Sequence, residues 1–446
     1  MVLGQRKNYL VTAAQFNSPV HRNFLRGLES YASDIDAELL VLTMRERIHD
    51  DIFPRGLEGA VVVPEGGTFR LNSKVHADNY HIRPQQIDPV TGLARFTQSD
   101  VTTLFASPKQ RLKVVPNSNN RLPKILMTTG AVTKPNYRRG FRISDIARRD
   151  HVYGAVIVEL ENNVGYHFRQ LQANSRGHFV DLGRRYEGDG GVKDASLEAM
   201  VLGDLHVGEH DPKVIKATYE MITELQPKRV VLHDFFNGHS VNHHDDNNLV
   251  ARARRFGNGQ YLLEQELSEA ADFLKELVDV SNGAEIVIVA SNHDEFLNRY
   301  LQEGRFVKEP HNIVMASRLL PEYIAGENPV KKGVEMFYDI PDNVQFLDRD
   351  QDYKVRGWQL GAHGDKGGNG SRGSIRQREN SYGKSITAHS HSPEIQRNTW
   401  VVGTSTHLDL DYLSGPSGWM NTHALLYDTG KTQLVNIING RWRRKE

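Results

Sequence analysis

The stretch Met200-Val201-Leu202-Gly203-Asp204-Leu205-His206 joins an apolar strand pattern to two potential metal ligands, Asp204 and His206. Four later segments repeat this arrangement, in which a short apolar run ends in side chains that bind metals. They are 230–232 before His233 and Asp234, 286–291 before Asn292, His293 and Asp294, 358–362 before His363, and 386–388 before His389 and His391. In layered α/β folds the carboxyl ends of the strands converge on one crevice, so we expect these side chains to meet in space.

Each of these elements is a weak signal when it is taken alone. An Asp-x-His pair is common by chance, and any one histidine is equally well explained as a surface or core residue with local hydrogen bonds. The pair His389 and His391 is more specific, because alternate residues of a strand share a face. The chain has 20 histidines and no cysteine, so a metal must be held by His, Asp, Glu or Asn. The ordered set therefore favours a metal site.

Strand-like and helical segments alternate after about residue 194, which predicts an α/β layered core. A β-α-β pattern over residues 9–42 indicates a separate N-terminal α/β domain, because 446 residues exceed the usual size of one domain. The glycine-rich segment 183–194 divides the two patterns. We therefore place the N-terminal domain at 1–185, a linker at 186–195 and the second domain at 196–446, and we expect no common core.

The N-terminal domain has no Gly-x-Gly-x-x-Gly or Walker-type loop, which leaves its role open. Residues 136–142 mix aromatic and basic side chains, as nucleic-acid surfaces do. This favours a substrate-positioning or oligomerisation module, and a purely structural role explains the composition equally well. The polar region 70–120 has weak periodicity and is either a long functional loop or an insertion.

The order Asp-x-His, Asp, Asn-His-Asp, His and His-x-His resembles the calcineurin-like metallophosphoesterase superfamily over residues 197–438. This resemblance implies a four-layer α/β/β/α sandwich for the second domain and a centre of two divalent metal ions. By the same resemblance, Asp204, His206 and His391 hold one ion, Asn292, His363 and His389 hold the other, and Asp234 bridges them. The resemblance favours Mn²⁺, and nitrogen and oxygen ligands also suit Fe, Zn²⁺ or Mg²⁺.

Two ions about 3.5–4 Å apart can bridge a phosphate, activate a shared water and stabilise the leaving oxygen. The resemblance places His293 beside this site, where it is the candidate general acid. Asp294 either orients the His293 ring or caps the helix that begins near Glu295. His233 and Ser291 replace glycines of the family pattern, and His233 either packs beneath the site or approaches the crevice.

The residues around the motifs favour one branch of the superfamily. Ser/Thr protein phosphatases carry Val-Asp-Arg-Gly and Asn-His-Glu, whereas this chain has Phe-Phe-Asn-Gly at 235–238 and Asn-His-Asp at 292–294. The pattern therefore resembles the SbcD-type repair nucleases. Lys366 and Arg372, in a glycine-rich segment, are candidate substrate-binding residues for a polyanionic strand, and an ordinary flexible loop explains them equally well. The same two interpretations apply to the basic cluster 252–255.

We therefore expect a metal-dependent phosphodiester hydrolase, namely a DNA nuclease encoded by a phage or mobile element. The alternatives are a nucleotide phosphodiesterase or phosphatase, and a non-catalytic metal-binding structural protein. Lysine plus arginine equals aspartate plus glutamate at 55 each, so local patches must bind any nucleic acid.

The apolar runs stay well short of the roughly 20 residues that a membrane helix needs, and the start of the chain lacks a signal-peptide pattern. We therefore expect a cytoplasmic protein, including the cytoplasm of a phage-infected host. The chain ends soon after its last hairpin, so no ATPase partner is implied. We also expect a homo-oligomer.

Overall fold

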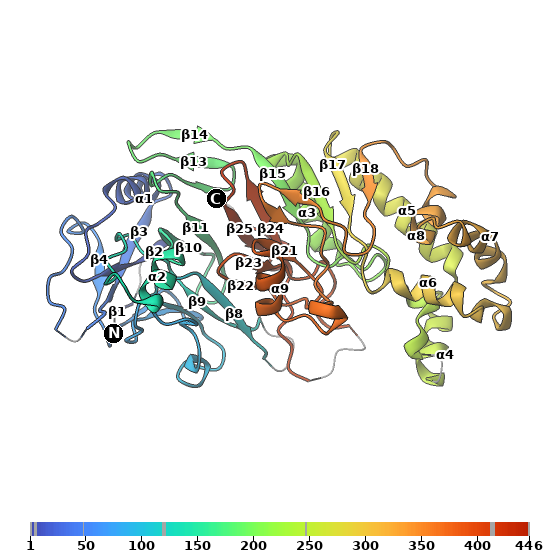
Figure 1. Cartoon of the computed structure of the whole chain (residues 1–446), viewed down its shortest axis with the longest axis horizontal. Helices are drawn as coiled ribbons and strands as arrows, with labels where there is room; N and C mark the ends of the chain where they lie inside the picture. The colour runs from blue at the N-terminus through green and yellow to red at the C-terminus, as the bar shows by residue number, and fades with distance from the viewer. Residues whose placement is uncertain are drawn as a thin grey trace.

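The computed structural model describes residues 2–3, 7–47, 49–117, 122–245, 248–410 and 415–444. Within these ranges it is a mixed α/β fold with four β-sheets, so the predicted α/β class is confirmed. Figure 1 shows the N-terminal sheet at one end, most of the C-terminal half's helices at the other, and the last strands of the chain between them. No helix in the described ranges is long and apolar enough to cross a membrane.

A six-stranded sheet with the order β18-β17-β16-β15-β24-β25 forms the centre of the C-terminal half. Its strands are β15 (Leu197–Val201), β16 (Arg229–Leu232), β17 (Glu285–Ile288), β18 (Val344–Phe346), β24 (Thr422–Tyr427) and β25 (Thr432–Asn436). Helices α3 (Pro212–Leu225), α5 (Leu263–Val280), α6 (Asp294–Gln302), α7 (Ile313–Ile324) and α8 (Pro329–Glu335) lie on one side. Side chains alternate along a strand, so Met200 packs toward the helices and Val201 toward the second sheet.

The second sheet has eleven strands in the order β1-β5-β6-β7-β9-β8-β22-β23-β21-β20-β19. The C-terminal half supplies β19 (Lys354–Val355), β20 (Trp358–Gln359), β21 (Ser385–Thr387), β22 (Glu394–Gln396) and β23 (Thr399–Val401), with α9 (Ile375–Tyr382) packed on β21 and β23. The N-terminal half supplies β1 (Val2–Leu3), β5 (Thr68–Arg70), β6 (Val75–Asp78), β7 (Thr102–Phe105), β8 (Arg111–Val115) and β9 (Lys124–Thr128). Region 70–120 therefore supplies strands to this sheet.

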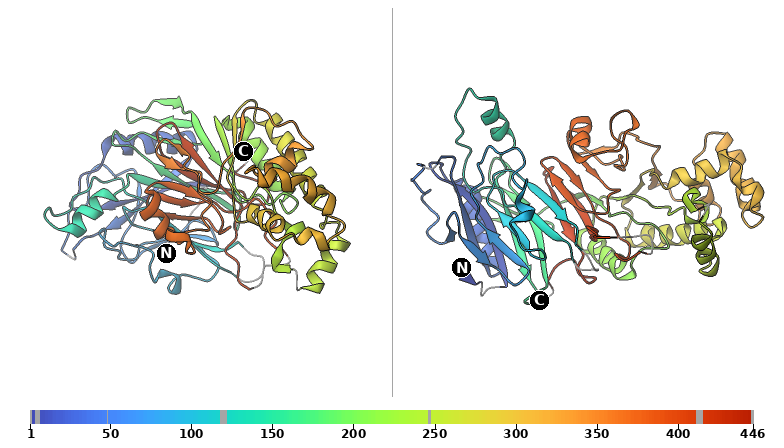
Figure 2. Two further views of the ribbon diagram at one scale, coloured as in Figure 1. Left: turned by 45° about the vertical axis from the view of Figure 1, so that its right-hand side comes forward. Right: turned by 90° about the horizontal axis from the view of Figure 1, so that it is seen from below.

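A five-stranded sheet with the order β11-β10-β2-β3-β4 completes the N-terminal half. Its strands are β2 (Asn8–Gln15), β3 (Ala37–Met44), β4 (Val61–Val63), β10 (Gly154–Leu160) and β11 (Tyr166–Gln172). Helix α1 (Arg22–Asp34) packs on its outer face through Phe24 and Leu28, and Val11 and Leu40 on the inner face pack against the eleven-stranded sheet. Helix α2 (Arg142–Arg149) projects beyond the sheets (Figure 2, right).

Strands β8 and β22 join the two halves. They pair antiparallel with Leu112 opposite Ile395, and one apolar core runs across this seam from Tyr9 to Trp400. The expectation of a separate N-terminal domain without a common core is therefore wrong. The sequence does not reveal the seam, because an edge strand is paired through backbone N–H and C=O groups that every sequence carries.

The predicted linker, 186–195, is also folded. Strands β13 (Arg184–Tyr186) and β14 (Val192–Asp194) form a hairpin that pairs with β12 (Phe179–Asp181). The Tyr186 side chain is buried in the core beside α1. The glycine-rich composition thus forms a tight hairpin turn, and the segment is not an extended connection.

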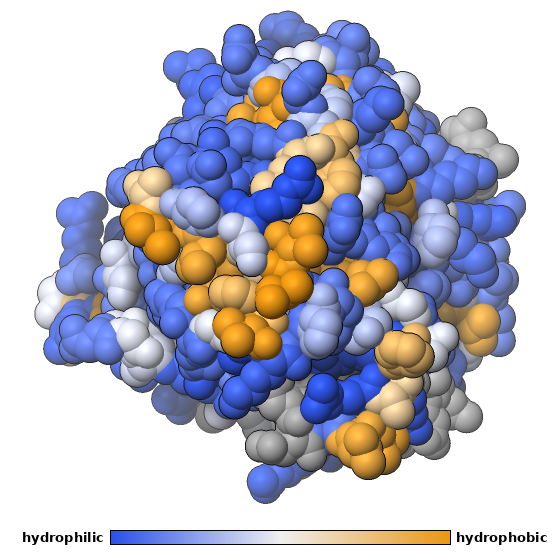
Figure 3. All heavy atoms as spheres, turned by 90° about the vertical axis from the view of Figure 1, so that its right-hand side faces the viewer, coloured by the Kyte–Doolittle hydropathy of each residue, from blue (hydrophilic) through white to orange (hydrophobic). Residues whose placement is uncertain are grey.

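Exposed apolar side chains gather at the helical end of the molecule (Figure 3). Val314 and Ile324 of α7 are 67% and 76% exposed, and Phe337, just after α8, is 41% exposed. Apolar surface of this kind is typical of protein contacts. The homo-oligomer stays a prediction.

Substituting Leu112 by Ala tests whether the two halves form one folding unit. Leu112 is 1% exposed in the common core, so the truncation should lower the free energy of unfolding by about 2–5 kcal/mol. Hydrogen exchange measured by mass spectrometry across a urea series should show β2 and β15 losing protection in one transition, shifted to lower urea in Leu112→Ala. Ile143→Ala, at a 52% exposed position, is the control. Separate transitions of β2 and β15 in the wild-type protein would contradict the common core.

Candidate metal centre

The seven predicted ligands lie together at the strand ends of the C-terminal half. Asp204 and His206 follow β15, Asp234 follows β16, and Asn292 follows β17 in the six-stranded sheet. His363 follows β20, and His389 and His391 follow β21, in the eleven-stranded sheet. The convergence predicted from the sequence is therefore present in the structure.

Contacts on one side of the cluster link four of these side chains. The Nε2 atoms of His206 and His391 are 3.1 Å apart, and His391 Nε2 lies 3.3 Å from Asp204 Oδ2. His206 Nε2 lies 3.4 Å from Asp234 Oδ2. Asp204, Asp234 and His391 can each direct one ligand atom to a common position, since these atoms lie within 4.8 Å of one another.

Asp234 also connects to the remaining predicted ligands. His363 Nε2 lies 3.3 Å from Asp234 Oδ2, and the His363 and His389 rings are 5.2 Å apart. His389 Nδ1 in turn lies 3.1 Å from Asn292 Oδ1. Asp234 therefore stands between the two groups of side chains, which is the position that the resemblance implies for it.

Seven potential ligand atoms of this cluster are buried without hydrogen-bond partners among the described residues: both Asp204 oxygens, Asp234 Oδ1, both His363 nitrogens and Nδ1 of His206 and His391. The hydrogen bonds between His206 Nε2 and His391 Nε2 and between His389 Nδ1 and Asn292 Oδ1 leave these seven atoms unsatisfied. Burying an unpartnered carboxylate costs several kcal/mol, and a coordinated cation removes that cost. The residues present therefore fit divalent metal ions, and their identity stays a prediction.

Burial sets the protonation of the cluster. It lowers the pKa of His206 to about 4 and holds the pKa values of His363 and His391 well below their usual range. These imidazoles are therefore neutral near pH 7, as metal ligands must be. Burial and the nearby Asp234 carboxylate raise the pKa of Asp204 well above its usual range. Cations between the two carboxylates would allow both to ionise.

Four of the predicted ligands have a left-handed backbone. The φ angles are 46° at His206, 47° at Asp234, 75° at His389 and 56° at His391. This conformation costs a residue with a Cβ roughly 1–2 kcal/mol. Such strain clusters at functional sites, where the surrounding structure enforces it. Here it turns the strand-end side chains inward.

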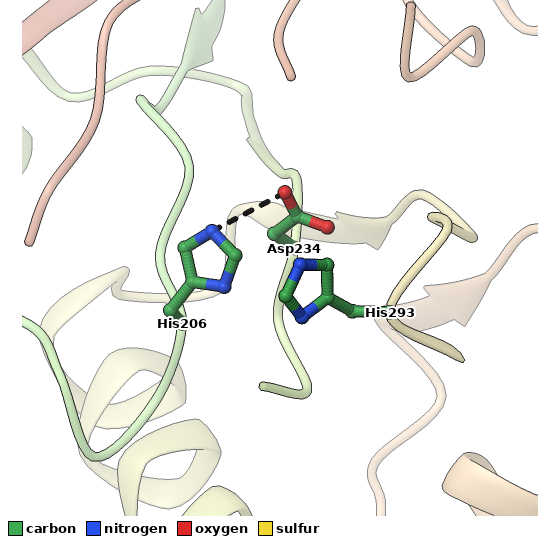
Figure 4. Close-up of side chains that lie close together, drawn as sticks. All are labelled: His206, Asp234 and His293. Atoms are coloured by element: carbon green, nitrogen blue, oxygen red, sulfur yellow. Dashed lines mark ion pairs between the residues drawn. The ribbon is translucent and has the colours of Figure 1, made fainter. Parts of the chain in front are cut away.

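His293 lies beside the centre (Figure 4). Its ring centroid is 4.5 Å from that of His206, and it forms a second group of potential ligands with His206 and Asp234. Its Nδ1 is hydrogen-bonded to the backbone carbonyl of Asn237. A carbonyl only accepts, so Nδ1 carries a proton and Nε2 is the ring atom available to the centre.

The role of orienting the His293 ring, which was predicted as one possibility for Asp294, belongs to the Asn237 carbonyl. The Asp294 carboxylate instead accepts hydrogen bonds from the Ser291 backbone N at 2.6 Å and Ser291 Oγ at 2.9 Å. It thus closes the turn that leads into α6. The sequence did not show this because a backbone carbonyl leaves no residue signature. His233 is fully buried, with its ring 5.6 Å from that of His363.

A cavity of about 820 Å³ opens on the centre. His206, Asp234 and His293 line one side, and Arg254 and Arg255 of α4 (Leu249–Gly257) also line it. The basic cluster on α4 does not follow a strand and belongs to no motif. The sequence therefore could not decide whether it binds phosphate or is an ordinary solvated surface.

The two predicted substrate-binding residues do not line this cavity. Lys366 Nζ lies 2.8 Å from Glu295 Oε1 on α6, and Arg372 is exposed. Neither placement supports the predicted role in the cavity itself. The spacing of Lys366 and Arg372 in the sequence did not show that an ion pair would hold the lysine.

Metal binding should stabilise the folded chain. After removal of metals with a chelator, Mn²⁺ at about 100 times its Kd should raise the free energy of unfolding by about 2.7 kcal/mol for one site. Thermal unfolding with and without Mn²⁺ measures this. Asp234→Asn should lose most of the Mn²⁺ effect because it weakens both ligand groups, and His178→Gln, outside the centre, should keep it. An equal Mn²⁺ effect in both variants would exclude Asp234 as a shared ligand.

Comparison with known proteins finds a similarity to a phage protein. The chain is 27% identical to "Protein A1" of Escherichia phage T5 over a match 470 residues long, which covers 98% of this chain and 83% of that protein. The name of that protein states no activity. No protein-family model and no solved structure matches the chain.

Proposed function

We propose that this chain is a two-metal phosphodiesterase of the metallophosphoesterase type that cleaves DNA. The observation that carries the proposal is the position of Asp234, whose Oδ2 lies 3.4 Å from His206 Nε2 and 3.3 Å from His363 Nε2, between the two sets of predicted ligands at the converging strand ends. The layering of helices, a six-stranded sheet and a second sheet with α9 on it agrees with the four-layer sandwich of that superfamily.

Each protein group has a defined task in this proposal. When bound, two divalent ions would polarise the phosphate and activate a water molecule between them. Asp234 holds the spacing, and the neutral histidines complete the two ligand sets. Manganese is the proposed metal, and Fe, Zn²⁺ and Mg²⁺ suit the same donors.

His293 is the proposed general acid. Its Nδ1 is held by the Asn237 carbonyl, which fixes the ring beside His206 and Asp234. In the protonated ring, Nε2 can donate a proton to the leaving oxygen, a step that contributes about 10²–10⁴ in rate. Asp294 acts only indirectly, because it positions the turn that carries His293.

DNA is the proposed substrate because the cavity has a basic wall. Arg254 and Arg255 on α4 line it together with His206 and Asp234 of the centre and with Glu209 and Asp409, and arginine binds phosphate oxygens in a bidentate manner. The cavity volume of about 820 Å³ also suits a small ligand, which favours a nucleotide phosphodiesterase as the second candidate. The similarity to a phage T5 protein supports the proposal of a phage-encoded chain.

His293→Gln tests the proposed chemistry. With Mn²⁺, the wild-type protein should cleave linear and circular DNA, and His293→Gln should do so about 10²–10⁴ times more slowly, since glutamine cannot supply the proton. Bound manganese, measured by atomic emission, should stay close to the wild-type level.

His178→Gln serves as the matched control and should cleave at the wild-type rate. Full activity in His293→Gln would rule out His293 as the acid. Turnover of bis(p-nitrophenyl) phosphate without any DNA cleavage would favour the nucleotide phosphodiesterase, and metal binding without either activity would favour a structural protein.

A further inference from the structure

The N-terminal half repeats the fold of the C-terminal half. The order β4-β3-β2-β10-β11 matches β17-β16-β15-β24-β25, with two parallel pairings followed by two antiparallel pairings in each. The order β5-β6-β7-β9-β8 likewise matches β19-β20-β21-β23-β22 in strand direction. Corresponding strands also occur in the same order along the chain in the two halves. The seam β8–β22 joins corresponding strands of the two repeats.

The pairing registers show which N-terminal residues stand where the predicted ligands stand. Ala13 bridges Ala131 in parallel as Asp204 bridges Thr404, so Ala13 corresponds to Asp204. Phe105 pairs with Thr128, which lies three residues before Ala131. In the same way Thr387 pairs with Val401, which lies three residues before Thr404, so Phe105 corresponds to Thr387. Ser107, two residues past Phe105, therefore corresponds to His389.

The same comparison places Gln15 at the position of His206. After β15 the Val207 N–H donates to the Phe235 carbonyl, and after β2 the corresponding Phe16 N–H donates to the Met44 carbonyl. Met44 therefore corresponds to Phe235, and Thr43 corresponds to Asp234. Alanine supplies no ligand atom, and the single threonine hydroxyl cannot replace a bridging carboxylate. Both groups of potential metal ligands among the described residues lie in the C-terminal half. Among the described residues, the N-terminal repeat therefore has no counterpart of the two-metal centre.

A basic cavity lies beyond the carboxyl ends of strands of the N-terminal repeat. Its volume is about 1050 Å³, and its lining includes Arg45, Arg47, Arg83 and Arg138, which come after β3, β6 and β9. Glu46 and Glu65 are its acidic residues, so arginines outnumber carboxylates four to two. A smaller hollow of about 260 Å³ shares Arg47 and Arg138 with it and reaches Gln15.

Several polar groups there are available to a ligand. Gln15 lines the smaller hollow and is 2% exposed; its Oε1 has no hydrogen-bond partner and, because an amide oxygen only accepts, it suits an N–H group of a base and not a phosphate oxygen. Arg45 is already engaged by Glu65 at 3.8 Å and by the Phe16 ring. The Arg47 and Arg83 side chains, in contrast, have no hydrogen-bond or ion-pair partner in the part of the chain that the structure describes. Phe141 adds an exposed aromatic ring beside Arg138.

We propose that this N-terminal cavity binds backbone phosphates of a nucleic acid and leaves them uncleaved. Arginines recognise phosphate oxygens, and an aromatic ring offers a base a stacking surface. Neither group of three potential metal ligands found among the described residues lies there, so we expect no two-metal activation of water and an intact phosphodiester. The choice of nucleic acid as the ligand rests on the proposed function, whereas the anion site rests on the cavity alone.

The two cavities serve different segments of a long polymer. Because β8 and β22 are antiparallel, corresponding strands of the two repeats run in opposite directions, and their carboxyl ends lie at opposite edges of the shared sheet. The N-terminal cavity therefore holds DNA away from the bond that is cut. Its effect should appear in affinity for DNA and leave the turnover of a small phosphodiester unchanged.

Arg47→Ala/Arg83→Ala tests this site. Binding of a fluorescein-labelled DNA duplex is measured by anisotropy in EDTA, over a series of salt concentrations. Loss of two phosphate contacts should weaken binding about tenfold and reduce the slope of log K against log salt by about 1.8. Arg47→Lys/Arg83→Lys should restore most of the affinity, and Mn²⁺-dependent turnover of bis(p-nitrophenyl) phosphate should match the wild type.

Arg184→Ala/Lys193→Ala is the control, because it removes the same charge from the hairpin β13–β14 beside α1. Wild-type affinity in Arg47→Ala/Arg83→Ala, or equal losses in both alanine pairs, would overturn the proposal. Wild-type protein that does not bind the duplex in EDTA would overturn it too. Arginine-dependent binding without cleavage in Mn²⁺ would support this site while contradicting the proposed nuclease activity.

Discussion

The buried carboxylate of Asp234 is the group on which the centre depends. It is 1% exposed and lies 3.3–3.4 Å from histidines that come from both large sheets. With Asp204 also fully buried, two carboxylates stand close together in a region of low dielectric constant, where their charges need cations. Without cations the burial of these two carboxylates destabilises the folded protein, and bound cations remove that cost in free energy. This difference in free energy is the physical basis of the proposed function.

The two large sheets supply the rigidity that such a centre needs. Their common core fixes the ends of β15, β16 and β21, and the strained backbone at His206, Asp234 and His391 is maintained by that packing. The same sheet continues through β8 and β22 into a second repeat, where neither the ligands nor, at Gln15, the left-handed backbone is present.

The sequence predicted the C-terminal half well, because strand-end ligands leave a residue pattern. The apolar runs predicted that Asp204, Asp234 and His391 follow strands and lie close together, and the structure shows this convergence. The seam at Leu112 and the carbonyl of Asn237 were missed. Each depends on backbone groups or long-range pairing, which carry no local signature. The topological repeat was missed for the same reason, since strand order is conserved there without the motifs.

The central claim is that Asp234 lies between two metal ions. Crystals grown with Mn²⁺ and measured at the manganese absorption edge test it most directly. The account predicts two anomalous peaks about 3.5–4 Å apart, one on each side of the Asp234 carboxylate, and none in the N-terminal cavity. A single peak that Asp234 does not contact, or no peak at the strand ends, would contradict it.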